Sequence, residues 1–200
     1  MEAKKKEDLL KEIEEYTKKI EKEPNNDIYY YIRGNDNRNL KKYKEAIKDY
    51  NKAIELNPKN ASYYNNRGIV YSNLEEYDKA VNDYSRAMEL NPKNASYYYN
   101  RGNTYSNLKE YEKAVNDYSR AIELNPKNAS YYNNRGIAYS NLEEYEKAVN
   151  DYSRAMELNP KNASYYNNRG IVYSNLEEYE KAVNDYSRAI ELNPKNASYY

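Results

Sequence analysis

Every glycine and every proline of this chain falls on a grid with a spacing of 34 residues. The glycines are Gly34, Gly68, Gly102, Gly136 and Gly170, and the prolines are Pro24, Pro58, Pro92, Pro126, Pro160 and Pro194. A fixed period of roughly 20–50 residues is typical of stacked repeats, in which each unit buries its apolar face against its neighbours. The grid therefore predicts a repeat array instead of an ordinary globular domain.

Five complete units follow when glycine is counted as the eighth residue of each: 27–60, 61–94, 95–128, 129–162 and 163–196. Residues 1–26 are interpreted as a degenerate half-repeat that forms a capping helix, and residues 197–200 as the truncated start of a sixth unit. The second and fifth units differ at two positions only, Asp78/Glu180 and Met88/Ile190. Such near-identity fits either recent duplication or consensus design.

Each unit is predicted to form two helices, because apolar residues recur every three or four positions in two successive stretches. In residues 61–94 the first stripe is Tyr64, Gly68, Tyr71 and Leu74, and the second is Tyr77, Ala80, Val81, Tyr84, Ala87 and Met88. In residues 1–26 the stripe is Leu9, Leu10, Ile13, Tyr16 and Ile20.

The ends of the helices follow from local chemistry. Pro92 ends the second helix because proline disfavours the helical conformation of the residue before it, and Asn94 can cap the next helix. A glycine inside a helix costs about 1 kcal/mol relative to alanine. We therefore expect the two helices to approach closely, with Gly68 against Ala80. The turn near residues 73–76 carries a weak local signal.

These residues resemble the tetratricopeptide repeat (TPR), a 34-residue unit with an aromatic at position 4, glycine at 8, tyrosine at 11, alanine at 20, an aromatic at 24, alanine at 27 and proline at 32. Residues 61–94 match it at Tyr64, Gly68, Tyr71, Ala80, Tyr84, Ala87 and Pro92. Two departures are an arginine at position 7, where the family has leucine, and Asn37 at position 11 of the first unit. The resemblance implies an all-α, right-handed superhelical solenoid of helix-turn-helix repeats.

The composition excludes several classes of function. The 32 basic and 32 acidic residues balance, which argues against a nucleic-acid or membrane-surface partner. No cysteine or histidine is present, so no thiol chemistry or thiolate metal site is expected. We expect no enzyme activity, no metal and no cofactor. With no signal peptide or transmembrane segment in the sequence, a cytoplasmic location is expected.

An arginine precedes the glycine in every unit, on a helix face that should be buried. It could bind an acidic peptide, but a buried arginine nearly always needs a carboxylate, and position 23 supplies an aspartate in every unit. We therefore predict structural ion pairs between Arg67 and Asp83, Arg101 and Asp117, Arg135 and Asp151, and Arg169 and Asp185, with Arg33 and Asp49 as the equivalents in the first unit.

Position 6 carries an asparagine in four units, and asparagine can both donate to and accept from a peptide backbone. Some superhelical TPR arrays hold extended peptides with a ladder of asparagines, and the resemblance places a concave groove on the first helices. The alternative is a solvated helix residue with no role. The candidate peptide-binding residues are Asn66, Asn100, Asn134, Asn168, Asn65, Tyr99, Asn103, Asn133 and Asn167.

The leading functional hypothesis is a non-enzymatic protein–protein interaction scaffold that binds an extended peptide or a partner helix in its groove. One alternative is a structural or designed array that stacks end to end, with a second copy as its partner. Another is the TPR segment of a longer enzyme or regulator. Because residues 197–200 open a unit that is not completed, we expect the chain to be an excised segment with an exposed C-terminal face.

Overall fold

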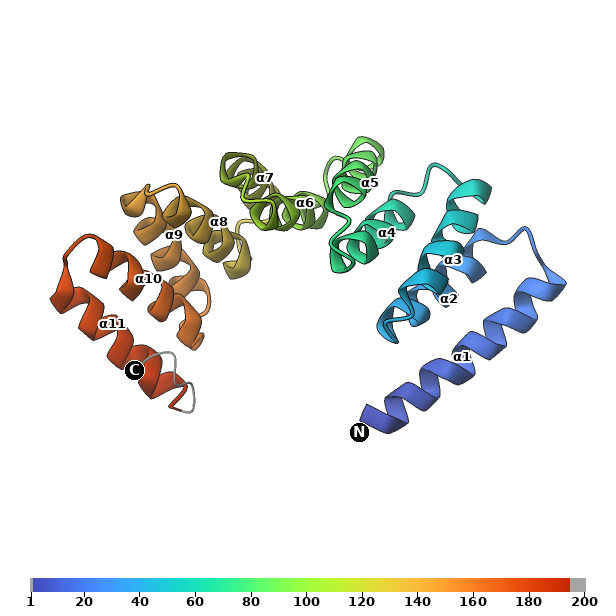
Figure 1. Cartoon of the computed structure of the whole chain (residues 1–200), viewed down its shortest axis with the longest axis horizontal. Helices are drawn as coiled ribbons and strands as arrows, with labels where there is room; N and C mark the ends of the chain where they lie inside the picture. The colour runs from blue at the N-terminus through green and yellow to red at the C-terminus, as the bar shows by residue number, and fades with distance from the viewer. Residues whose placement is uncertain (1, 195–200) are drawn as a thin grey trace. The chain divides into compact units, whose positions relative to one another are not determined.

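A computed structural model describes residues 2–194, which form eleven α-helices and no strand (Figure 1). The chain divides into two compact units, each larger than a single 34-residue repeat: the first unit is Met1–Lys93 and the second unit is Asn94–Tyr200. The first holds α1 (Glu2–Lys22), α2 (Asp27–Asn39), α3 (Tyr43–Leu56), α4 (Ala61–Asn73) and α5 (Tyr77–Leu90). The second holds α6 (Ala95–Asn107), α7 (Tyr111–Leu124), α8 (Ala129–Asn141), α9 (Tyr145–Leu158), α10 (Ala163–Asn175) and α11 (Tyr179–Leu192). The predicted all-α class and the two helices per repeat are confirmed.

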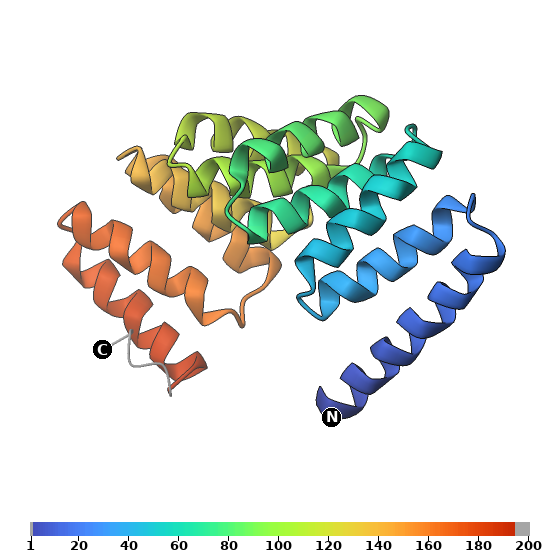
Figure 2. The same ribbon diagram turned by 45° about the vertical axis from the view of Figure 1, so that its right-hand side comes forward.

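The helices pair as antiparallel hairpins, which both ribbon views show (Figures 1 and 2). In the first unit α2 packs against α3, α4 packs against α5, and α1 packs on α2. In the second unit the hairpins are α6 with α7, α8 with α9 and α10 with α11. Successive hairpins also contact each other, through α3 and α4 in the first unit and through α7 with α8 and α9 with α10 in the second. The predicted truncated start of a sixth repeat, residues 197–200, lies outside the described residues.

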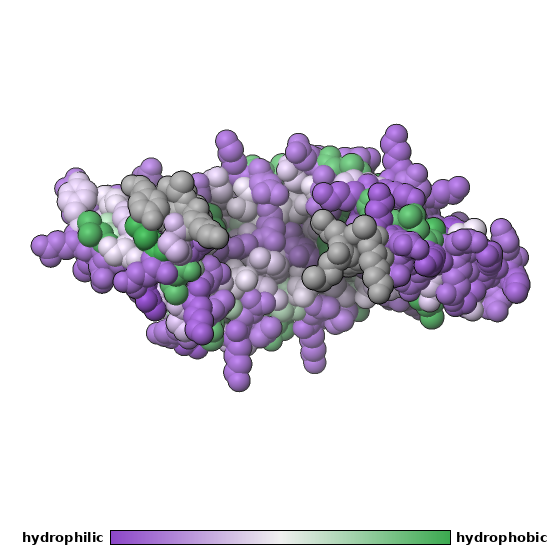
Figure 3. Space-filling view, turned by 90° about the horizontal axis from the view of Figure 1, so that it is seen from below, coloured by the Kyte–Doolittle hydropathy of each residue, from purple (hydrophilic) through white to green (hydrophobic). Residues whose placement is uncertain are grey.

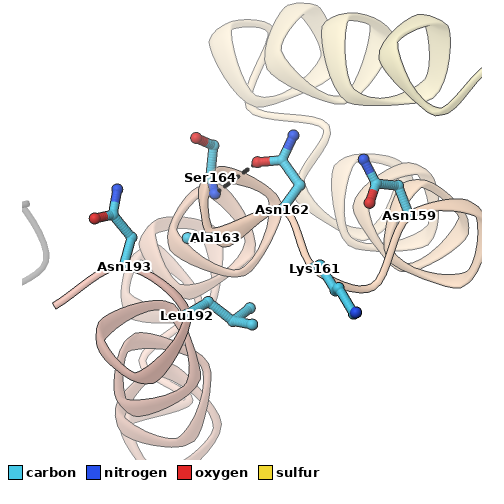
Figure 4. Close-up of a pocket in the computed structure, with 7 residues that line it drawn as sticks. All are labelled: Asn159, Lys161, Asn162, Ala163, Ser164, Leu192 and Asn193. Carbon is cyan, nitrogen blue, oxygen red and sulfur yellow. Dashed lines mark hydrogen bonds between the residues drawn. The ribbon is translucent and has the colours of Figure 1, made fainter.

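An asparagine begins the first helix of each hairpin. The side-chain oxygen of Asn60 accepts a hydrogen bond from the backbone N–H of Ser62 at 3.1 Å, which satisfies one of the donors that a helix start leaves without a partner. Figure 4 shows the same cap before α10, where Asn162 accepts from Ser164 at 3.0 Å. The recurring Asn-Pro-Lys-Asn stretch thus ends one hairpin and starts the next.

The turn inside each hairpin has no glycine, which explains its weak sequence signal. Glu75 adopts a left-handed conformation with φ 60°, and the N–H of Glu76 donates to the carbonyl of Tyr71 at 2.9 Å. This is the Schellman arrangement that closes a helix, and it usually contains glycine. The equivalent left-handed residues are Lys41, Lys109, Glu143 and Glu177.

The core of each hairpin consists of tyrosine and alanine. Ala80, Tyr84 and Ala87 of α5 are at most 2% exposed. A Cβ added to Gly68 would lie 2.9 Å from Cε1 of Tyr84. The expected close approach of the helices at glycine is therefore found. Its neighbour, however, is the ring of Tyr84 and not Ala80, because the flat ring lies directly over the glycine.

The buried face of the first helices differs from the predicted stripe. In α4 the structure buries Tyr63 and Val70 almost fully, whereas Leu74, which caps the C-terminal end of α4, is 37% exposed. Because α4 packs against both α3 and α5, it has two buried faces, and a single stripe describes it poorly. On α1, Leu10 is 41% exposed, since it lies about 100° from Leu9 around the helix and falls off the packed face.

Candidate functional site

Each repeat contains one bidentate arginine–aspartate pair between its two helices. The pairs are Arg33–Asp49, Arg67–Asp83, Arg101–Asp117, Arg135–Asp151 and Arg169–Asp185. The Nε–Oδ2 distances are 2.7–3.0 Å and the Nη2–Oδ1 distances 2.6–2.8 Å. The hydrogen bond to Asp185 raises the pKa of the Arg169 guanidinium. Two of the three guanidinium nitrogens of each arginine thus hold the two helices of its repeat together.

The third nitrogen of the guanidinium links neighbouring repeats. Nη1 of Arg135 donates to the Ser119 hydroxyl at 3.0 Å, and Nη1 of Arg169 donates to the Ser153 hydroxyl at 2.8 Å. In the first unit, Nη1 of Arg67 donates to Asn51 at 2.6 Å. Sequence reasoning missed this contact, although a serine recurs two residues after the aspartate in the second helix of repeats two to five, with Asn51 in its place in repeat one, and was a visible signal.

The position-6 asparagines join first helices of adjacent repeats. In the first unit the amide nitrogen of Asn66 donates to the Tyr31 hydroxyl at 3.0 Å and to the side-chain oxygen of Asn35 at 2.9 Å. The side-chain oxygen of Asn66 accepts from Asn65 at 3.0 Å. The Tyr50 hydroxyl also donates to Asn35, at 2.8 Å. Both amide hydrogens of Asn66 are therefore used within the protein.

The second unit repeats this network and extends it by one repeat. Asn134 donates to Tyr99 at 3.0 Å and to Asn103 at 2.9 Å. Asn133 donates to Asn134 at 3.0 Å, and Asn168 donates to Asn133 at 3.0 Å. An amide ladder thus runs along α6, α8 and α10. One amide hydrogen and the side-chain oxygen of Asn168 are not used in it.

The remaining candidate residues lie on the same helices. Asn100 and Asn167 are half-buried, and the backbone carbonyl of Asn100 accepts a hydrogen bond from Thr104 at 3.1 Å. The hydrogen-bond network depends on an alternation of residue types between successive repeats, at positions 5 and 9, that was not used in the sequence analysis. Repeats one and three have tyrosine at position 5 and asparagine at position 9, where repeats two and four have asparagine and isoleucine.

A shallow pocket of about 260 Å³ opens on the first helices of the second unit. Its lining is Asn103, Ser106, Asn107, Tyr118, Asn134 and Ile137. Amide and hydroxyl groups surround one apolar side chain, with no charged residue among the six. This lining can form hydrogen bonds to a neutral peptide backbone and accept a small apolar side chain. In the face of the molecule seen in Figure 3, the hydrophobic patches are small and scattered among hydrophilic residues.

A second hollow, of about 420 Å³, lies beside the start of α10 (Figure 4). Its lining comes from the connection between repeats four and five and from the end of α11: Asn159, Lys161, Asn162, Ala163, Ser164, Leu192 and Asn193.

Among the described residues, no three His, Cys, Asp or Glu side chains are placed to hold a metal ion. In residues 2–194, no helix is both long and apolar enough to cross a membrane.

Comparison with known proteins identifies the family. A tetratricopeptide repeat model matches residues 61–94, 95–128, 129–162 and 163–196, and a TPR repeat model matches residues 34–75. The chain belongs to the tetratricopeptide repeat family. A search of curated proteins found no match.

Solved structures of TPR proteins share the fold. YrrB, described as a TPR protein with an unusual peptide-binding site, is 26% identical with a TM-score of 0.78, and the match covers 92% of this chain and 95% of YrrB. A MamA protein is 25% identical with a TM-score of 0.78, with 86% and 94% covered. MamA residues 41 to the end from Desulfovibrio magneticus RS-1 are 20% identical with a TM-score of 0.80, with 86% and 97% covered. This repeat fold is typical of protein–protein interaction scaffolds.

Proposed function

We propose that the chain is a non-enzymatic scaffold that binds an extended peptide on its first helices. The observation that carries this proposal is the pocket between α6 and α8, whose lining is neutral, rich in amides and open to solvent. An extended peptide leaves its backbone N–H and C=O groups without partners, and amide side chains can satisfy both kinds of group. The peptide-binding site ascribed to YrrB, a protein of similar structure, supports this proposal.

The hydrogen-bond network gives the ladder asparagines a second role. Asn134 already uses both amide hydrogens inside the protein, so it holds its neighbours in place beside the pocket. Within residues 2–194, Asn168 makes one side-chain hydrogen bond and keeps further donor and acceptor capacity, and Asn107 is exposed at the pocket rim. We propose that these two asparagines contact the peptide directly and that Asn66 and Asn134 fix the surface on which it lies.

The experiment that tests this proposal blocks the pocket with a bulky side chain. Asn107→Trp places an indole at the rim without breaking any hydrogen bond of the network, and Asn116→Trp is the matched control, since Asn116 is an exposed asparagine on the second helix α7. Fluorescence anisotropy with labelled, capped random decapeptide pools compares the two variants with the parent chain. We expect Asn107→Trp to weaken binding at least about tenfold and Asn116→Trp to leave it unchanged. Equal binding by both variants would refute the proposal.

A second candidate function is self-association through the outer face of α11. Tyr179 and Val183 are both 63% exposed. On α9 the equivalent Tyr145 and Val149 are half-buried and pack with Val172 of the next repeat. A second copy could cover the exposed pair in the same way.

Sedimentation velocity across a concentration range, with the whole chain, tests this candidate. Val183→Glu should abolish any concentration-dependent increase in mass, and Asn116→Glu, at an exposed site away from this face, should not. A protein that remains monomeric at all concentrations would exclude self-association as its function.

A further inference from the structure

The six residues that line the pocket of the second unit have counterparts 68 residues earlier, in the first unit. The counterparts are Asn35, Arg38, Asn39, Tyr50, Asn66 and Ile69. Five of the six positions carry the same residue in both units. The single difference is Arg38, which takes the place of Ser106.

Two hydrogen bonds recur in both sets of residues. The tyrosine hydroxyl donates to the position-9 asparagine at 2.8 Å in each unit, from Tyr50 to Asn35 and from Tyr118 to Asn103. The position-6 asparagine donates to that same residue at 2.9 Å in each unit. The two surfaces thus share one framework, and they differ in charge.

Arg38 differs from every other arginine of the chain. Nine of the ten arginines, all within the described residues, pair with an aspartate or a glutamate. Among the described residues no carboxylate lies within ion-pair distance of Arg38, which is half-buried in the last turn of α2.

Arg38 occupies the position from which its counterpart Ser106 lines the pocket of the second unit, and it lies three residues after Asn35 on α2, so both residues share one face of that helix. Burial raises the pKa of the Tyr50 hydroxyl, and the positive charge of Arg38 acts in the opposite direction. Arg38 therefore lies on the face of α2 that corresponds to the pocket of the second unit. A half-buried arginine with no carboxylate partner can make charge-assisted, bidentate hydrogen bonds to an incoming carboxylate.

We propose that the surface around Arg38 binds the carboxylate of an aspartate or glutamate side chain in an extended peptide. The guanidinium would hold the carboxylate, while Asn35 and Asn39 flank it, and the equivalent surface of the second unit, with Ser106, would prefer a neutral residue. This inference rests on the proposed peptide-binding function and adds the chemistry of the ligand to it. Hydrogen bonds to charged groups correspond to a preference of roughly tenfold to a hundredfold.

The experiment uses the whole chain and labelled decapeptide pools that are acetylated and amidated, with either Glu or Gln fixed at the centre and no other acidic residue. The readout is the ratio of the dissociation constants of the two pools. Three variants are compared with the parent chain: Arg38→Ser, which copies the second unit; Ser106→Arg, which copies the first; and the double exchange. Circular dichroism verifies that each variant is folded.

We expect the parent chain to bind the Glu pool about tenfold more tightly than the Gln pool. Arg38→Ser should bring the ratio close to one, Ser106→Arg should increase the preference, and the double exchange should restore the parent value. Added salt should reduce the preference.

Three results would overturn the inference in different ways. A ratio near one in the parent chain, or a ratio that Arg38→Ser leaves unchanged, refutes the acidic-side-chain site while peptide binding itself stands. No binding of either pool refutes the proposed function as well. A third pool, with Gln at the centre and a free C-terminus, tests the other source of a carboxylate. If it binds as tightly as the Glu pool in an Arg38-dependent way, the ligand is a peptide C-terminus instead.

Discussion

Asp36 is a buried carboxylate at a position that the other repeats fill with uncharged residues. It is 6% exposed, and its counterparts Val70, Thr104, Ala138 and Val172 are all 0% exposed. No described group forms a hydrogen bond with its Oδ2 atom. Burial, and secondarily the negative charge of Glu12 on α1, raise the pKa of Asp36 to about 6, from 3.8 for an unperturbed group. Replacing this residue should therefore stabilise the protein.

The size and sign of the effect follow from the two pKa values. In the folded protein Asp36 keeps its proton up to about pH 6, whereas in the unfolded chain it releases the proton near pH 4. The free energy of unfolding therefore falls as the pH rises from about 4 to about 6, and it stays at the lower level at neutral pH. At about 1.36 kcal/mol per pKa unit, this shift lowers the free energy of unfolding, relative to strongly acidic solution, by about 3 kcal/mol at pH 7.5 and by about 1 kcal/mol at pH 4.5.

Asp36→Val introduces the residue that two other repeats have at this position. We expect its stabilising effect to be about 2 kcal/mol larger at pH 7.5 than at pH 4.5, measured by equilibrium urea unfolding followed by circular dichroism. Thr104→Val is the control, since it removes a buried hydroxyl at the same position of repeat three without removing a charge, and its effect should not depend on pH. An Asp36→Val gain that is equal at both pH values, or a loss at pH 7.5, would refute this reasoning.

Three further changes test the contacts between and within repeats. Arg67→Ala should lower the free energy of unfolding by about 3–5 kcal/mol, because it leaves the buried Asp83 without a partner; urea unfolding measures this, and a loss below about 1 kcal/mol would contradict the buried pair. Gly68→Ala should destabilise by about 1–3 kcal/mol despite the better helix propensity of alanine, because its Cβ would meet the Tyr84 ring at 2.9 Å; a higher midpoint of thermal unfolding would contradict it. Asn134→Ala should cost about 1–3 kcal/mol by stranding its hydrogen-bond partners, and unchanged stability would show that the network contributes nothing.

The sequence allowed the repeat fold to be predicted well because its strongest signals are local and periodic. The proline and glycine grid marked where hairpins end and where helices approach. A single helical stripe, however, assumes one buried face, and so it omitted Tyr63 and Val70, which are buried on a helix packed on two sides, and it included Leu74, which lies at the exposed C-terminal end of that helix. The turn at Glu75 was weakly marked, since its left-handed residue is not glycine.

The candidate site was predicted less completely, because its contacts join residues about 31–36 positions apart. The asparagines of position 6 were predicted to bind a peptide, but their hydrogen-bond partners within the protein depend on how adjacent first helices are placed, as in the bond from Asn66 to Tyr31. The tyrosine–asparagine alternation was visible in the sequence, and so was Arg38, which stands where the other repeats have serine. Their meaning required the geometry that brings Asn35, Tyr50 and Asn66 together.

In the proposed function, peptides bind on the first helix of each hairpin. The most direct test is to titrate the isotopically labelled chain with the capped decapeptide pool and to follow backbone amide chemical shifts by NMR. We expect changes concentrated in α2, α4, α6, α8 and α10, with the largest at residues such as Asn107 and Ile137 that line the pocket. Changes concentrated in α3, α5, α7, α9 and α11, or no changes at a saturating peptide concentration, would contradict the proposal.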